Sequence, residues 1–382
     1  MIDENDVRYM RLALQMARNA TGRTTPNPLV GAVIVQAGRV VATGWHRQAG
    51  TPHAEIHALN MAGELARGAT LYVTLEPCAH YGRTGPCAVA VRDAGIARVV
   101  VGMRDPNPLV AGKGLKILTD AGVAVDVFAD DSDIAACCWQ LNEVFLKWIP
   151  HKQPFVMLKT AMSLDGKIAT VTGESQWITG EAARARVHEW RDIYDGIMVG
   201  IGTVLHDDPA LTTRLADGRP GRNPVRIIVD SQARTPLTAQ VVTDGAASTI
   251  IAVTDGAPAE RIAALERSAQ VEVLRCGSGP QVDVAQLFQQ LGQREICSIF
   301  VEGGGTLAYS LLAAGLVDKV QAFVAPLLIG GREALTPVEG AGSAHLADAV
   351  RLHDVQYEQV GGDLLVTGYT RSAAERRKLS WS

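Results

Sequence analysis

The sequence predicts two α/β domains, and three observations support this prediction. The chain has 382 residues, which exceeds the usual size of a single hydrophobic core. Apolar, strand-like runs alternate with segments of helical spacing in both halves, as they do where helices pack on a sheet. The segment PHKQP at 150–154 brackets polar residues with two prolines, which disfavour helix. We therefore expect one domain over residues 1–149 and another over residues 150–382.

The first half is expected to begin with a helix and then to alternate between strands and helices. Helical spacing predicts a helix over 6–20, which the TTPNP segment at 24–28 ends. Apolar runs predict strands at 29–35, 40–46, 69–77 and 97–103, the first two forming a hairpin around AGR. Further helices are expected at 54–65, 88–93 and 133–149.

The second half restarts at PFVMLKTAMSLDGK, residues 154–167. Its strand candidates include 225–231, 248–254, 297–303 and 320–329. Helical segments separate several of these strands, so the second domain is also predicted to be α/β.

Composition and charge exclude several classes of protein. Hydrophobic residues make up 47% of the chain and charged residues 20%, which is ordinary for a globular protein. A net charge of −4 argues against a general polyanion binder. The acidic N-terminus MIDENDVRYM lacks a secretory h-region. The sequence has no run of about 18 apolar residues, so no membrane span is expected. We expect a cytoplasmic protein whose six cysteines include some that are free to bind a metal.

The segment HAE at 53–55 and the segment PCAHYGRTGPC at 77–87 together indicate a catalytic zinc site. Such a site has three protein ligands and an open fourth position for water. A histidine two residues before a glutamate, followed by Pro-Cys and a second cysteine, is typical of zinc deaminases. His53, Cys78 and Cys87 are the expected ligands, and Glu55 is the expected proton carrier. A lone His-x-Glu on a helix is more often a solvated face, so the cysteines decide the interpretation.

The spacing of the cysteines departs from the usual deaminase pattern. Eight residues separate Cys78 from Cys87, whereas Cys-x-x-Cys is the usual arrangement. The intervening loop must fold back to the metal, and Gly82, Gly85 and Pro86 suit such a turn. His57 and His80 are expected outside the ligand set, because a fourth protein ligand would close the open position. The other four cysteines are expected to be buried free thiols: Cys137, Cys138, Cys276 and Cys297.

The string PCAHYGRTGPC, with TTPNPLVGAV before it and MRDPNPLVAGKG after it, resembles the bacterial bifunctional riboflavin-biosynthesis deaminase–reductases over nearly the whole chain. The resemblance implies an N-terminal cytidine-deaminase-like α/β/α domain. This domain would deaminate 2,5-diamino-6-(5-phosphoribosylamino)pyrimidin-4(3H)-one. Matching by motif, the substrate contacts there would be Asn27, His46, Arg83 and Thr84. Asn27 also fits a plain turn residue between prolines, and His46 a plain strand end.

The second half has no metal pattern, but two glycine-rich turns follow strands. GIGT at 200–203 and EGGGT at 302–306 would let backbone amides approach a pyrophosphate at a helix N-terminus. Neither turn is GxGxxG, so a standard dinucleotide fingerprint is absent. A simple tight turn explains either segment alone about as well.

The same resemblance implies that this second domain has a dihydrofolate-reductase-like α/β fold and uses NADPH to reduce the ribosyl group to ribityl. It implies nucleotide contacts at Ala161, Trp177, Thr203, Asp207, Ser231, Gly304, Gly305, Thr306, Leu307, Ala308, Tyr309 and Ser310. It implies substrate contacts at Lys159, Ser175, Arg191, Leu211, Arg214 and Glu302. The two arginines suit the substrate phosphate. Glu302 and Lys159 are the candidates for a proton donor to the opened sugar.

Two rival functions remain open at the level of sequence. A nucleic-acid (tRNA) editing deaminase fused to a binding module would need a basic, aromatic-bearing surface, which the net charge of −4 and the 5% aromatic content disfavour. A non-enzymatic structural zinc protein would normally use four protein ligands. We expect a bifunctional enzyme with a phosphorylated pyrimidine substrate, zinc and NADPH. We further expect no nucleic-acid or membrane partner, and a homo-oligomer, either a dimer or a tetramer.

Overall fold

The computed structural model describes residues 2–79, 85–107 and 110–380, which fold into two compact units. The first unit contains the residues up to His151 together with Leu379 and Ser380, and the second contains Lys152–Lys378. Within the described ranges, no helix has both the length and the apolar character needed to cross a membrane.

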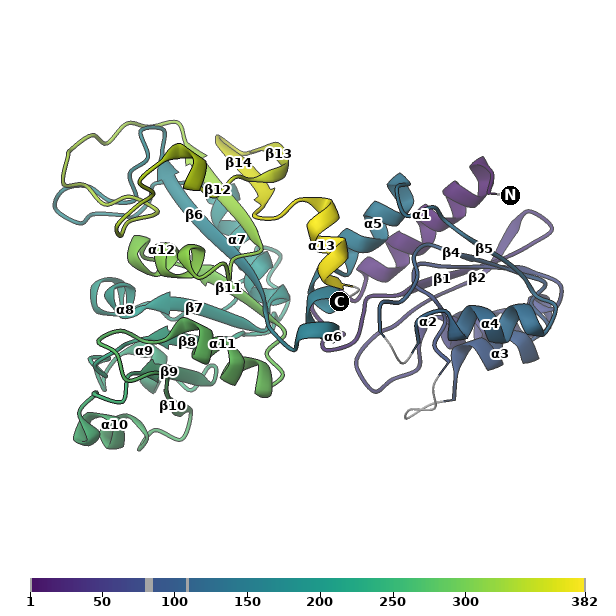
Figure 1. Ribbon diagram of the computed structural model, residues 1–382, viewed down its shortest axis with the longest axis horizontal. Helices are drawn as coiled ribbons and strands as arrows, with labels where there is room; N and C mark the ends of the chain where they lie inside the picture. The colour runs from purple at the N-terminus through teal and green to yellow at the C-terminus, as the bar shows by residue number, and fades with distance from the viewer. Residues whose placement is uncertain (1, 80–84, 108–109, 381–382) are drawn as a thin grey trace. The chain divides into compact units, whose positions relative to one another are not determined.

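The sheet of the first unit has five strands in the order β2-β1-β3-β4-β5 (Figure 1). The strands are β1 (Gly31–Gln36), β2 (Arg39–Trp45), β3 (Thr70–Val73), β4 (Arg98–Val101) and β5 (Ala124–Val127). β1 runs antiparallel to both β2 and β3, whereas β3, β4 and β5 are parallel. The parallel strands place their carboxyl ends at one edge, and the chain after β3 leads there to the first cysteine of the predicted metal site.

Helices cover both faces of this sheet, which gives the predicted α/β/α arrangement. α1 (Glu4–Arg18) packs on the strands with α5 (Asp133–Leu141) beside it, while α2 (Ala54–Ala62), α3 (Cys87–Asp93) and α4 (Lys113–Asp120) form the opposite layer (Figure 1). A reciprocal capping box between Asp3 and Asp6 begins α1. Gly31 lets α1 lie against β1, because a Cβ there would collide with the Ala13 carbonyl.

The second unit contains a nine-stranded sheet in the order β10-β9-β8-β7-β11-β6-β12-β14-β13. The strands are β6 (Phe155–Ser163), β7 (Gly196–Gly200), β8 (Val225–Val229), β9 (Thr249–Val253), β10 (Val271–Arg275), β11 (Ser298–Glu302), β12 (Lys319–Ala325), β13 (His353–Val360) and β14 (Asp363–Tyr369). All neighbours are parallel except β12–β14 and β13–β14. The central strands are continuous apolar runs because helices bury both of their faces.

The helices of the second unit are α7 (Glu181–Ile193), α8 (Ile201–Asp207), α9 (Gln240–Thr243), α10 (Ala259–Leu265), α11 (Val284–Gln293) and α12 (Gly305–Ala313). The last helix, α13 (Ala373–Ser380), belongs to this unit up to Lys378. Leu287 of α11 and Leu311 of α12 belong to one core cluster with strand residues such as Ile299. Trp190 of α7 packs instead against Phe300, with ring centroids 6.0 Å apart. Residues 299 and 300 alternate along β11, so α7 lies on the other face from α11 and α12.

Most of the predicted elements exist, but several boundaries were wrong. The mainly helical stretch expected around 133–149 consists of two helices, α5 and α6 (Glu143–His151), which meet at Asn142, whose side chain pairs with the backbone of Leu29 at 2.8 and 3.0 Å. Pro150 lies in the last turn of α6 rather than ending it. The strand expected at 69–77 ends at Val73, and the one expected at 320–329 ends at Ala325.

Candidate functional site

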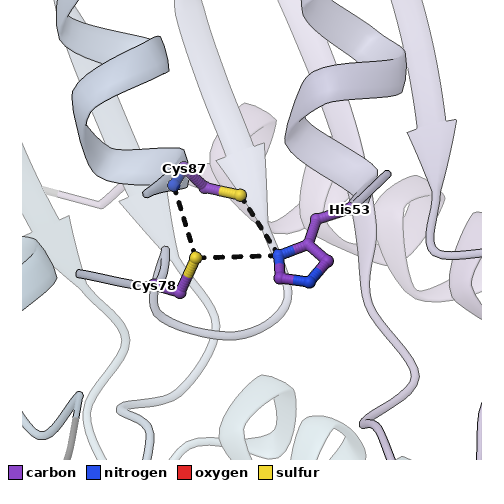
Figure 2. Close-up of side chains that lie close together, drawn as sticks. All are labelled: His53, Cys78 and Cys87. Atoms are coloured by element: carbon purple, nitrogen blue, oxygen red, sulfur yellow. Dashed lines mark hydrogen bonds between the residues drawn. The ribbon is translucent and has the colours of Figure 1, made fainter. Parts of the chain in front are cut away.

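His53, Cys78 and Cys87 come together in the first unit (Figure 2). Their donor atoms all lie within 4.8 Å of one another. The His53 Nδ1 atom is 3.6 Å from the Cys78 sulfur and 3.3 Å from the Cys87 sulfur. Among the described residues, no other group of three or more His, Cys, Asp or Glu side chains is spaced to hold a metal ion.

Two helix N-termini and one strand end position these side chains. His53 is the N-cap residue of α2, and Cys87 is the first residue of α3. Cys78 follows β3, and its sulfur accepts a 3.3 Å hydrogen bond from the Cys87 backbone amide. A backbone amide that points at sulfur favours the thiolate form, which is the form that binds metal.

The electrostatics of the two thiols differ. The pKa of Cys78 is lowered to about 4, because the Cys87 thiol and the His53 ring stabilise its thiolate although burial opposes this. The pKa of Cys87 is raised, chiefly by its bond to Cys78 and by burial. The Cys78 sulfur also raises the pKa of His53. Two sulfurs and one imidazole are a donor set that suits Zn²⁺, and this set leaves one tetrahedral position for water. The residues therefore fit a catalytic zinc ion.

Glu55 lies in the first turn of α2 and is 3% exposed. Burial and the negative Cys78 sulfur raise its pKa to about 7. A carboxyl group with a pKa in this range can both take and return a proton near neutral pH.

The expected substrate contacts Asn27 and His46 lie together, 3.1 Å apart between Asn27 Nδ2 and His46 Nε2. His46 Nδ1 is 3.2 Å from the Pro52 carbonyl, which can only accept, so Nδ1 carries the ring proton and Nε2 accepts from Asn27. The His46 ring meets the His53 ring edge-on at 5.2 Å. Burial lowers the pKa of His46, so the ring stays neutral beside the metal ligands. Arg83, Thr84 and His80 lie outside the described residues.

Glu76 is an organising residue that the sequence motifs did not single out. Its buried carboxylate accepts four backbone N–H groups, from Asp105, Gly112, Gly114 and Leu115, at 3.1–3.4 Å. These amides surround the start of α4, where an anion is favoured. A glutamate directly before the Pro-Cys pair was the only sequence signal for this anchor.

In the second unit, Lys159, Arg191 and Glu302 form one ionic cluster. Arg191 Nη2 lies 2.8 Å from Glu302 Oε2, and Lys159 Nζ lies 3.4 Å from Glu302 Oε1. Glu302 ends β11 and pairs in register with Lys159 of β6. Although burial opposes it, Arg191 and Lys159 lower the pKa of Glu302. The cluster occupies the carboxyl end of parallel strands, where open α/β sheets bind ligands.

The two glycine-rich turns of the second unit lie side by side. A Cβ on Gly303 would be 2.8 Å from the Thr203 hydroxyl, and a Cβ on Gly200 would be 3.9 Å from Leu307. Gly303 and Gly304 both have positive φ, at 145° and 64°, so the tight turn into α12 requires glycine. The start of α8 and the start of α12 thus line one strip of the sheet edge, as a dinucleotide site requires.

The other residues expected to contact the nucleotide are placed as follows. Trp177 is 67% exposed, and the Arg184 guanidinium stacks 4.7 Å from its ring centroid. Two hydroxyls have local partners: Ser231 accepts from the Val282 amide, and Ser310 donates to the Thr306 carbonyl. Ala161 lies on β6, Asp207 ends α8, and Ala308 and Tyr309 lie in α12. Ser175, a substrate candidate, is half-buried before α7.

All six cysteines are free thiols. Cys138, Cys276 and Cys297 are buried as predicted, whereas Cys137 is half-buried. His57 is not a member of the metal cluster. Its Nε2 atom is buried and has no hydrogen-bond partner among the described residues.

Comparison with family models divides the chain as its fold does. Residues 3–103 match the cytidine and deoxycytidylate deaminase zinc-binding region. Residues 154–366 match the RibD C-terminal domain.

Relatives match across nearly the whole chain. The riboflavin biosynthesis protein RibD of Actinobacillus pleuropneumoniae is 44% identical, over 94% of each chain. The Acinetobacter baumannii RibD structure superposes with a TM-score of 0.83 at 38% identity, covering 96% of this chain and 99% of that one. A diaminohydroxyphosphoribosylaminopyrimidine deaminase/5-amino-6-(5-phosphoribosylamino)uracil reductase from Thermotoga maritima gives 0.83 at 35% identity, covering 96% and 98%.

Proposed function

This chain belongs to the RibD family of bifunctional riboflavin-biosynthesis enzymes, and on that premise we propose how its residues divide two reactions between them. Residues 1–149 carry a zinc-dependent deaminase and residues 150–382 carry an NADPH-dependent reductase. The deaminase removes an amine from 2,5-diamino-6-(5-phosphoribosylamino)pyrimidin-4(3H)-one as ammonia. The reductase then converts the ribosyl group of the deaminated product to a ribityl chain.

The buried Glu55 beside three metal donors is the observation that carries the deaminase assignment. His53, Cys78 and Cys87 would hold the zinc ion, which when bound would supply a Lewis acid that favours hydroxide over water near neutral pH. Glu55 takes one proton from the attacking water and delivers it to the ring nitrogen. It then takes the proton of the newly added hydroxyl group and delivers it to the amine, which leaves as ammonia as the carbonyl forms.

Substrate contacts in the deaminase are proposed for two parts of the chain. His46 fixes the Asn27 amide through its Nε2 atom, so that the asparagine presents one orientation to the pyrimidine. Arg83 and Thr84 of the loop between the two cysteines bind the phosphate end of the substrate.

The ionic cluster of Lys159, Arg191 and Glu302 supports two roles in the reductase, which are orientation of the substrate and supply of a proton to it. When bound in this unit, NADPH would supply the hydride for the reduction at C1′ of the opened sugar. Lys159, whose Nζ atom lies 3.4 Å from Glu302 Oε1, is the group that we propose to give a proton to the sugar oxygen. Arg191, Arg214, Ser175 and Leu211 complete the substrate side.

The cofactor is proposed to bind along the two glycine-rich turns of the second unit. Gly304–Ser310 at the start of α12, with Thr203 and Asp207 of α8, cradle the cofactor phosphates. Ala161, Trp177 and Ser231 contact the remainder of the cofactor.

The proposal also covers the cellular location, the oligomeric state and the partners of the enzyme. We assign it to the cytoplasm and expect a homo-oligomer, either a dimer or a tetramer. A phosphorylated pyrimidine is its partner. The nucleic-acid editing alternative is not supported by any relative described above, all of which carry riboflavin-pathway names.

Replacement of Glu55 by glutamine tests the deaminase assignment. Glu55→Gln preserves side-chain shape and removes the carboxylate, so zinc content is expected to stay at one ion per chain while ammonia release falls at least about 1,000-fold. NADPH oxidation on the deaminated substrate is expected to be unchanged. The exposed Glu64→Gln on the same domain is the matched control and should alter neither activity.

Two outcomes would overturn the assignment. Retention of ammonia release by a zinc-loaded Glu55→Gln enzyme would remove Glu55 from the reaction. Simultaneous loss of both activities would show that the two sites are not independent.

A further inference from the structure

The segment 211–214, which carries two of the residues proposed to face the reductase substrate, begins in a strained conformation. Leu211 has a φ of 51° and is 3% exposed. A branched, bulky side chain in the left-handed region is unfavourable, and such a residue persists only where the surrounding contacts over-determine it. The segment therefore needs anchors.

One anchor comes from Arg222 and Asn223, which precede β8. The Thr213 amide donates to the Asn223 side-chain oxygen at 2.9 Å, and the Thr213 hydroxyl donates to the Arg222 carbonyl at 2.8 Å. These hydrogen bonds fix Thr213 but neither Thr212 nor Arg214.

The remaining anchors come from α7. Arg191 and His188 are three residues apart on this helix and share a face. Arg191 Nη1 donates to the Thr212 carbonyl at 3.0 Å, and His188 Nδ1 accepts from the Arg214 backbone amide at 3.2 Å. The two side chains thus hold the residues on either side of Thr213.

The chemistry of His188 suits this contact. An Nδ1 atom that accepts a hydrogen bond carries no proton, so the ring must be neutral. Burial and the neighbouring Arg191 and Arg214 lower the pKa of His188 to about 4, which Glu302 and the Thr212 carbonyl only partly oppose. The ring therefore stays an acceptor in the physiological range, between two guanidinium groups.

Arg214 itself is exposed, and its guanidinium forms no ion pair with any described residue. Arg191, in contrast, is committed to Glu302 through two of its nitrogens. Of the two arginines, Arg214 is the one with its full guanidinium available for a phosphate.

We propose that His188 is a positioning residue of the reductase: its Nδ1 atom fixes the backbone at Arg214 so that this guanidinium is presented to the substrate phosphate. The proposal rests on the proposed role of Arg214 in binding the substrate. His188 does not itself contact the reacting atoms. Its effect is expected on substrate affinity rather than on hydride transfer.

Three variants of the full-length protein test this role: His188→Leu, His188→Asn and Arg214→Gln. Leucine fills the space without an acceptor, whereas asparagine offers an oxygen close to the place of Nδ1. In steady-state NADPH oxidation on 5-amino-6-(5-phosphoribosylamino)uracil, His188→Leu is expected to raise the substrate KM about tenfold, with kcat within about threefold. His188→Asn should recover most of this loss. The KM for NADPH should not change, which shows that the reductase is folded, and the exposed Glu189→Gln on α7 is the matched control.

A phosphate-free substrate separates positioning from a general structural role. On the dephosphorylated compound, His188→Leu and wild type should show the same KM, and the double variant His188→Leu/Arg214→Gln should be no worse than Arg214→Gln on the phosphorylated one. If Arg214→Gln leaves the substrate KM unchanged, the proposed role of Arg214 fails. If Arg214→Gln raises KM while His188→Leu does not, or if the His188→Leu loss is equal on both substrates, the positioning role is refuted.

Discussion

Glu339 places a negative charge where the cofactor phosphates are proposed to bind. Its carboxylate accepts a 3.1 Å hydrogen bond from Thr306 Oγ1, and its amide donates to the Gly305 carbonyl. Its side chain also packs where a Cβ on Gly305 would lie. A carboxylate at a helix N-terminus is favourable on its own, but it repels a second anion.

Glu339→Gln is therefore expected to strengthen cofactor binding. The amide keeps the size of the side chain and the backbone bond to Gly305, and it removes the repulsion of about 1 kcal/mol, which corresponds to about a fivefold lower KM for NADPH. The effect should shrink as salt is raised. An unchanged or higher KM for NADPH would show that the phosphates do not bind beside Glu339.

At the scale of single residues, the sequence was most informative where short motifs contain the interacting side chains. His53, Glu55 and Cys78 were predicted from residue type and spacing. The structure brings His53 and Cys78 together with Cys87, and the buried Glu55 interacts with both cysteines. His188 could not be found in this way, because its partner is a backbone amide 26 positions later, and the approach of the two is decided by tertiary packing. Glu76 was not predicted from the sequence for the same reason, since its four hydrogen-bond partners are backbone amides.

Among the elements, α1 is tied to the sheet by a buried ion pair. Arg98 of β4 donates two hydrogen bonds to the Asp6 carboxylate of α1, at 2.8 and 2.9 Å, and Tyr72 of β3 donates a third at 2.8 Å. Although burial alone would raise it, these contacts lower the pKa of Asp6 from 3.8 to about 2. The carboxylate thus joins three elements of the first unit.

Asp6→Asn is expected to destabilise the first unit by about 2 kcal/mol, because Arg98 and Tyr72 lose the charged acceptor of their hydrogen bonds while Arg98 keeps its ion pair with Asp126. Hydrogen-exchange mass spectrometry of the full-length protein should show faster exchange in α1 and β4 and no change in β11. The control is Asp93→Asn, which breaks the exposed Arg92 pair and should cost less than about 1 kcal/mol. Equal exchange in Asp6→Asn and wild type would contradict the anchoring role.

The same pair predicts the acid sensitivity of this unit. The pKa of Asp6 is lower in the folded than in the unfolded chain, so its contribution to stability is present above about pH 4 and is lost as pH falls toward 2. The Asp6→Asn variant should lack this part of the pH dependence. If both proteins lose stability in parallel over that range, another group is responsible.

Element boundaries were harder to predict than element types. The apolar periodicity of 133–149 is continuous, and only the distant bond between Asn142 and Leu29 divides it. The strand expected at 69–77 is apolar almost to its end, yet residues after Val73 leave the ladder and bring Glu76 and Cys78 to the site. Such tertiary contacts override the local propensity of the sequence for helix or strand.

For the molecule as a whole, the two compact units imply two separable activities. Removal of zinc by a chelator should abolish ammonia release and leave NADPH oxidation on the deaminated substrate unchanged, because no metal-ligand cluster is found among the described residues of the second unit. Re-addition of zinc should restore ammonia release. A parallel loss of NADPH oxidation in the chelated protein would contradict the independence of the units.

The α/β fold class could be predicted from the sequence alone, since it depends on the repeated alternation of strands and helices. The sequence did not reveal that the second sheet ends in the antiparallel strands β14 and β13. β13 is mostly exposed and lacks the apolar run that identifies a buried strand.

The most direct measurement is zinc K-edge X-ray absorption on the metal-loaded full-length protein. Two sulfur ligands at about 2.3 Å, one nitrogen at about 2.0 Å and one further light atom are expected, with the sulfur count falling to one in Cys87→Ser. A single sulfur in the wild-type protein, or four protein ligands with no exchangeable position, would contradict a catalytic zinc site made by His53, Cys78 and Cys87.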